Sequence, residues 1–206
     1  MITLKLVDSV KNIEADIYSA IAEHLNSKLS NAKATLERKI KEYVGIQINN
    51  SYEMIELRGG YLQGALGVLD PVSAVEGIIS AVENSVKVNV RKYDKKLKSG
   101  GIEIYVQPSN FSNLLGLSIG NTVIDGGKLH WLRWLLEFGD KIIVVGYDYS
   151  PENGLGRTGL GTMEKGGSFR VPPAFAGVPD DNFITRSIVT VQTDNFLTKL
   201  IEDTLR

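Results

Sequence analysis

The stretch SVKNIEADIYSAIAEHLNSKLSNAKATLERKIKEY (Ser9–Tyr43) decides the first element of the fold. It contains no proline or glycine, and its apolar residues recur at steps of three and four with a single gap of seven. That spacing places them on one face of an α-helix. The sequence therefore predicts a long amphipathic helix, and it leaves open whether the helix is broken near residues 26–30.

We expect a single domain over residues 1–206, in which residues 1–45 form a helical extension. Its second face is charged, with residues such as Lys11, Glu14 and Lys33. Two interpretations fit a helix of this kind. It packs against a neighbouring molecule, or it lies on its own sheet and exposes a solvated charged face.

The segments that follow mix helices and strands without a regular alternation. Glycines in residues 51–69 predict short helical pieces, and Asp70-Pro71 has the capping residue and first-turn proline that open a second helix. Alternating apolar residues at 86–93 and 102–107 predict a β-hairpin with one buried face. Leu129–Phe138 is apolar around its circumference and predicts an enclosed helix.

The last third of the chain adds a strand, a glycine-rich stretch and a helical tail. A strand is predicted at 141–147, a flexible glycine-rich arm at 150–175, and a C-terminal helix interrupted around Thr190–Asp194. The expected class is α+β: a long N-terminal helix, an antiparallel β-sheet with packed helices, the extended arm and the C-terminal helix.

The composition of the chain excludes some classes of function. With 206 residues, 43% hydrophobic residues and a net charge of −1, the chain should fold without a global field that attracts nucleic acid or anionic lipid. It has no cysteine, which excludes disulfides and thiolate chemistry. The N-terminus lacks the pattern of a secretory signal, so we expect synthesis in the cytoplasm and no membrane partner.

Few residues suggest catalysis. Gly154–Gly159 matches a dinucleotide fingerprint, but no strand leads directly into it and no helix follows. His24 and His130 lack a histidine partner at metal-ligand spacing, and we expect His24 on the exposed side of the long helix and His130 in a core or an interface. The sequence therefore predicts no catalytic, metal-binding or cofactor-binding residues and no enzyme activity.

One concentrated basic patch lies at the predicted hairpin turn. Its residues are Arg91, Lys92, Lys95, Lys96 and Lys98. They could contact a nucleic-acid backbone or an acidic neighbour. The alternative is that they keep the hairpin soluble and its edge unpaired.

A longer pattern resembles the neck and tail-completion proteins, which join head to tail in tailed bacteriophages. It comprises Trp131–Asp140, Gly156–Gly159, Met163, Gly166–Pro173, Phe175–Gly177 and Asn182–Arg186. The N-terminal helix and the turn at 57–64 are compatible with this resemblance.

The resemblance implies a virion structural protein without catalytic residues, made in the host cytoplasm. It implies a homo-oligomeric ring, six-fold or twelve-fold, that contacts a portal or connector protein and a tail-tube or tail-terminator protein, with DNA close by in the pore. A glycine-rich arm could become ordered on the next subunit of such a ring. The candidate interface residues are Trp131, Trp134, Arg157, Lys165, Phe169, Arg170, Pro172 and Pro173.

Alternatives remain at this point. Both tryptophans could equally belong to the core. The protein could be a virion-associated hydrolase or nucleotide-binding module that uses the glycine-rich loop. It could also be a monomeric adaptor that binds a partner through the long helix.

Overall fold

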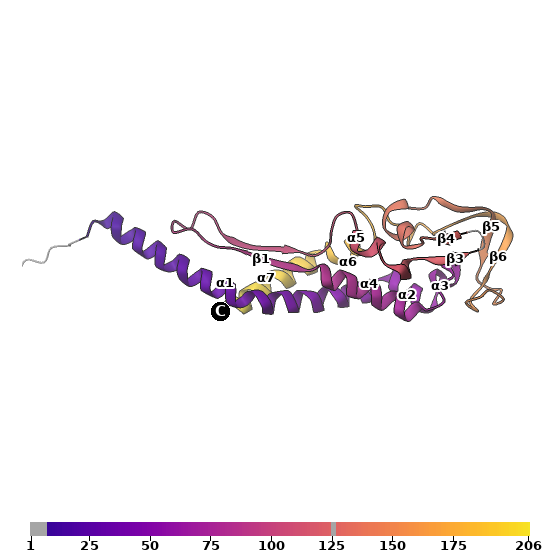
Figure 1. The fold of residues 1–206 in the computed structure, drawn as a ribbon, viewed down its shortest axis with the longest axis horizontal. Helices are drawn as coiled ribbons and strands as arrows, with labels where there is room; N and C mark the ends of the chain where they lie inside the picture. Colours follow the sequence, from indigo (N-terminus) through magenta and orange to yellow (C-terminus); the bar gives the residue numbers. More distant parts are fainter. Residues whose placement is uncertain (1–7, 125–126) are drawn as a thin grey trace, which may run out of the picture.

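The computed structural model describes residues 8–124 and 127–206 and shows an elongated molecule built along one helix (Figure 1). This helix, α1 (Val10–Asn49), has 40 residues. The hydroxyl of Ser9 caps its start by accepting from the Asn12 amide at 3.2 Å. It is continuous, so the break considered near residues 26–30 does not occur.

Three shorter helices follow α1. They are α2 (Tyr52–Gly59), α3 (Tyr61–Leu66) and α4 (Pro71–Ser85), and two of them, α2 and α4, pack against α1. The Asp70 carboxylate accepts from the Ser73 amide at 3.1 Å, and Pro71 takes the first helical position. The start signal predicted at Asp70-Pro71 is therefore confirmed, as are the short helical pieces before it.

The strands form separate hairpins. The pairs are β1 (Lys87–Arg91) with β2 (Gly101–Tyr105), β3 (Thr122–Ile124) with β4 (Gly127–Leu129), and β5 (Ile142–Ser150) with β6 (Thr162–Arg170), all antiparallel. Among the described residues each sheet has only two strands, so the single antiparallel sheet expected from the sequence is divided into three. Each hairpin has to bury its apolar face against helices, since two strands alone are marginally stable.

The connecting segments are short. They are α5 (Ser112–Leu115), a 3-10 turn (Ser118–Gly120) and a π-helical turn, η2 (Trp134–Phe138). The enclosed helix predicted over Leu129–Phe138 is thus shorter, because Leu129 ends β4. Leu132, Leu135 and Leu136 are buried, as the apolar circumference predicted.

The glycine-rich stretch is extended and has a partner in its own chain. Residues 162–170 form β6, which pairs along β5, and residues 151–161 are the turn that joins the two strands. The dinucleotide-like Gly154–Gly159 therefore lies inside a hairpin turn, where no helix start is available to a phosphate. The same local context, a turn without a following helix, argues against a nucleotide site in the sequence.

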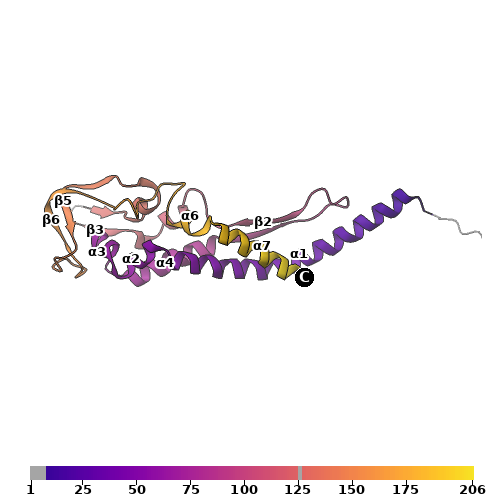
Figure 2. The same cartoon turned by 180° about the vertical axis from the view of Figure 1, so that it is seen from behind.

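The tail returns along α1. It forms α6 (Phe183–Ile188) and α7 (Val191–Leu205). The predicted interruption occurs, but it covers Val189 and Thr190 rather than Thr190–Asp194, because Thr190 caps α7 and residues 191–194 form its first turn. Both views show α7 lying beside α1 (Figures 1 and 2). The rings of Tyr43 and Phe196 stack at 3.9 Å, which places the start of α7 near the end of α1.

The core lies between the C-terminal part of α1 and the elements folded against it. Its fully buried side chains include Leu36, Ile40, Ile48, Met54, Leu57, Leu62, Ile78, Leu114, Trp131, Phe169 and Phe183. Helices and antiparallel hairpins share this one core, which confirms the α+β class. No helix of the described ranges has the length and apolar character needed to cross a bilayer.

Candidate assembly surfaces

The first three turns of α1, Val10–Ile21, project beyond the body of the molecule; we call this segment the spike (Figure 1). Its apolar residues are exposed: Val10 at 69%, Ile13 at 37%, Ile17 at 52% and Ile21 at 40%. The first buried residue of α1 is Ala22. An isolated helix of this length is marginal in water, so a partner that covers the stripe would stabilise the spike.

Carboxylates border the apolar stripe of the spike. Successive helical residues are rotated by about 100°, which puts Val10, Ile13, Ile17 and Ile21 on one face. On the same projection Glu14 lies at one border, and Asp16 and Glu23 lie at the other. The stripe therefore has an apolar centre with carboxylates on both sides, and Lys11 is the one lysine or arginine of the spike, about 80° outside the stripe on the Glu14 side.

The stripe begins where α7 ends. The Lys28 ammonium donates to the carbonyl oxygens of Leu205 at 2.9 Å and Arg206 at 3.1 Å. A cation at this position satisfies carbonyls that a helix C-terminus leaves unpaired. The chain's last helix thus covers α1 only as far as Lys28, and the spike continues past it.

The second candidate surface is the tip of the β1–β2 hairpin, residues 91–101, which carries the predicted basic patch. Arg91, Lys92, Lys95, Lys96 and Lys98 are all exposed. Arg91 pairs with Glu103 on β2, whereas the four lysines have no ion pair within the described part of the chain. The tip therefore presents four lysines against a single carboxylate, that of Asp94.

Asp94 and Asn26 hold the tip in place. The Asp94 carboxylate accepts from the amides of Lys98 at 3.0 Å and Lys96 at 2.8 Å, and these backbone hydrogen bonds lower the pKa of Asp94 below its ordinary value of 3.8. The side chain of Asn26 on α1 donates to the Tyr93 carbonyl at 3.0 Å and accepts from its amide at 2.7 Å. The lysines are thus displayed on an anchored turn beside α1.

Two of the predicted interface residues belong to the protein's own core. Trp131 is 0% exposed and Phe169 is 1% exposed. A fully buried ring cannot contact a neighbouring subunit without local unfolding, so the interface prediction is corrected to a core role for both. Trp134 is half-buried, with its ring edge-on to Phe138 at 5.1 Å, and it retains an accessible side.

The other predicted interface residues lie on or near the β5–β6 hairpin. The Arg157 guanidinium donates to the Val123 carbonyl at 2.6 Å, and Arg170 lies 3.8 Å from the Asp140 carboxylate. Lys165 and Pro173 are exposed, and Pro172 is half-buried. These residues lie at the end of the molecule opposite the spike, so the structure does not gather all the candidates into one surface (Figure 1).

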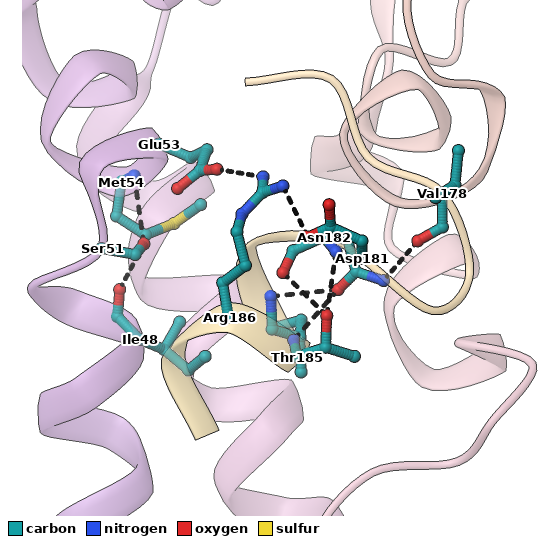
Figure 3. A network of polar contacts seen from close by, with 10 residues as sticks. Ile48, Ser51, Glu53, Met54, Val178, Asp181, Asn182, Thr185 and Arg186 are labelled. Atoms are coloured by element: carbon teal, nitrogen blue, oxygen red, sulfur yellow. Dashed lines mark hydrogen bonds and ion pairs between the residues drawn. The ribbon is translucent and has the colours of Figure 1, made fainter. Parts of the chain in front are cut away.

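A polar cluster at the start of α6 links this helix to α2 (Figure 3). The Arg186 guanidinium donates to Glu53 at 2.6 Å and to Asp181 at 3.0 Å. Glu53 has a side chain only 6% exposed, whereas that of Asp181 is 67% exposed. Burial is the largest single effect and disfavours the charged guanidinium, but the hydrogen bonds and negative charges of Glu53 and Asp181 together outweigh it and raise the pKa of Arg186 above its ordinary value.

Asn182 completes the cluster as a capping box. Its side-chain oxygen accepts from the amides of Ile184 and Thr185, and the Thr185 hydroxyl accepts from the Asn182 amide at 2.9 Å. The side-chain amide group of Asn182 also donates to the carbonyls of Val178 and Pro179. The arrangement fixes the entry into α6, and it satisfies a fully buried asparagine.

We predict that Arg186→Ala lowers the free energy of unfolding by about 2 kcal/mol, because it leaves the buried Glu53 carboxylate without its charged donor. Urea unfolding followed by circular dichroism measures this loss. The matched control is Arg38→Ala, whose partner Glu42 is exposed and whose loss should cost at most about 0.5 kcal/mol. Equal effects of the two substitutions would contradict the structural role of Arg186.

The remaining candidates for chemistry are a pocket and the two histidines. A pocket of about 780 Å³ between α3 and the β5–β6 hairpin has Arg157 as its one charged lining residue. Burial raises the pKa of Tyr149, another lining residue, and its hydroxyl donates to the Leu160 carbonyl at 2.9 Å.

His24 is exposed as predicted; His130 is also exposed, so it is not a core histidine. Groups of three or more metal-ligating side chains are absent from the described ranges.

Comparison with known proteins adds no relative: family models, curated proteins and solved structures all gave no match. Sequence reasoning identified the basic patch, but it missed the Glu53–Arg186 pair. These residues are 133 positions apart, and no local pattern connects them.

Proposed function

We propose that this protein is a structural subunit of a tailed-phage head–tail junction, which works by self-association and shape rather than by catalysis. The observation that carries the proposal is the spike, a projecting helix whose apolar stripe has no cover in the described part of the chain. Contiguous exposed apolar surface marks interaction sites in folded proteins. A long helix projecting from a small domain is suited to bridging subunits.

The energetic argument favours an assembled state. Fully burying a valine or isoleucine side chain is worth roughly 1.5–3 kcal/mol, and the stripe offers four such residues in partly exposed form. Their combined burial can offset part of the cost of association, which is several kcal/mol. Additional contacts from polar or aromatic side chains are still required, because one helical stripe is smaller than a standard interface.

The neck and tail-completion resemblance supports the phage part of the proposal. Within its pattern, Trp131 fills the core, Asn182 caps α6 and Arg186 pairs with a buried carboxylate. These are packing and capping roles, which suit a pattern that maintains a shape. Portal and tail proteins are the partners that this proposal implies, and the virion is the location.

A monomeric adaptor is the second candidate function. The stripe with carboxylate borders on the spike would also fit a basic groove on an unrelated partner protein. Solution mass separates the two functions, since an adaptor remains a monomer until that partner is added.

The test is light scattering of the purified protein over a concentration series, alone and with a portal or tail-tube protein. We expect a mass above that of the 22.6 kDa monomer that rises toward a fixed ring mass. The double substitution Ile13→Ser with Ile17→Ser should reduce the mass without changing the helical signal of the body. A wild-type protein that stays monomeric in all mixtures would overturn the proposal.

A further inference from the structure

We propose that the spike of one copy docks on the β1–β2 hairpin tip of a neighbouring copy. The occupant of the bare stripe is then a second copy of this chain, bound through a different surface. This inference rests on the proposed self-association and specifies its contact.

Charge complementarity selects the hairpin tip. The spike and the residues next to it carry three carboxylates around the stripe (Glu14, Asp16 and Glu23) against one lysine, Lys11. The tip carries four lysines without ion pairs in the described structure against one carboxylate, Asp94. A symmetric pairing of two spikes would bring carboxylate borders together, which is unfavourable. Pairing a spike with a tip brings opposite charges together instead.

The tip also offers apolar surface between its lysines. Tyr93 and Leu97 are half-buried there. The aliphatic stems of lysines can cover further apolar area while their ammonium groups stay in water. An apolar centre with a basic rim matches the apolar stripe and its acidic borders.

A copy cannot satisfy its own stripe in this way. The tip contacts α1 through Asn26, on the side of the helix where Ala22 is buried. Relative to Ala22, Ile21 and Ile17 are rotated by about 100° and 140° around the helix. The stripe therefore faces away from the tip of the same copy, and only a neighbour's tip can reach it.

The geometry also suits a closed assembly. Spike and tip lie at the same end of the elongated molecule, so copies standing side by side bring one against the other (Figure 1). Because the spike and the tip are different surfaces, each copy uses its spike to contact one neighbour and its tip to contact another. Contacts of this heterologous kind generate rings when the rotation closes.

The absence of cysteine in the natural chain allows a direct test by disulfide capture. Purified full-length Ile17→Cys and Lys96→Cys proteins are mixed under mild oxidation, and cross-linked dimers are separated by size. We expect Ile17→Cys to pair with Lys96→Cys several-fold faster than with itself. The matched control is Asn12→Cys, which is on the spike but about 140° from Ile17, and it should pair slowly.

Charge exchange gives an independent measurement on folded protein. Glu14→Lys with Asp16→Lys should lower self-association, as should Lys95→Glu with Lys96→Glu, and mixing the two variants should restore it. High salt should weaken the wild-type contact.

The outcomes separate this inference from the proposed function. An oligomer in which Ile17→Cys pairs mainly with itself, or no faster than Asn12→Cys pairs with Lys96→Cys, overturns the spike–tip contact and leaves self-association standing. A wild-type protein that remains monomeric alone and with virion partners overturns both.

Discussion

Trp131→Ala is expected to lower the free energy of unfolding by about 3–5 kcal/mol, the range for removing a large buried aromatic side chain. The ring is completely buried, and its indole nitrogen has no hydrogen-bond partner among the described residues. The substitution therefore removes packing contacts and no hydrogen bond. For a chain of this size we expect the melting temperature to fall by roughly 10 °C. Differential scanning calorimetry measures it.

Two controls distinguish this core role from an interface role. Trp134→Ala removes the same side chain from a half-buried position and should cost clearly less stability. Trp131→Phe retains most of the apolar volume and should be intermediate. If Trp131→Ala left the monomer's stability unchanged but abolished assembly, the original interface interpretation would be restored.

Gly177→Ala is expected to destabilise the protein by about 3 kcal/mol, at the upper end for overpacking a close-packed site. A methyl group at this position would overlap the Leu135 carbonyl oxygen and lie 2.8 Å from the Asn182 β-carbon. The Gly177 amide donates to the Trp134 carbonyl at 3.0 Å, and its carbonyl accepts from Gly139 at 2.8 Å. The backbone therefore has no room to retreat from the π-helical turn.

Gly59→Ala is the matched control for that substitution. Gly59 is the last residue of α2, and a methyl group added there meets nothing within 4 Å. Alanine is favoured over glycine in a helix, so this variant should be neutral or stabilised by up to about 1 kcal/mol. Urea unfolding of the two variants side by side measures the difference. A tolerated Gly177→Ala would mean that the loop at 175–178 packs differently.

The candidate surfaces were only partly predictable. The basic patch was predictable because its five cationic residues lie within residues 91–98, and its exposure follows from the turn that carries them. The exposure of the spike was not predictable from the sequence. The apolar periodicity of α1 is similar before and after Ala22, although the C-terminal part of the helix is buried and its first turns are exposed. Nothing local distinguishes an apolar stripe covered by α7 from one left open beyond Lys28.

The sequence by itself determined the secondary elements: the long helix, the capped start at Asp70-Pro71, the first hairpin and the interrupted tail. These depend on periodicity, capping and turn residues, which act over a few positions. Only the tertiary structure decided that β6 pairs with β5, that Trp131 is core, and that Arg186 meets Glu53. Those outcomes depend on which distant segments share a core and which surfaces remain without cover, and no local pattern encodes that.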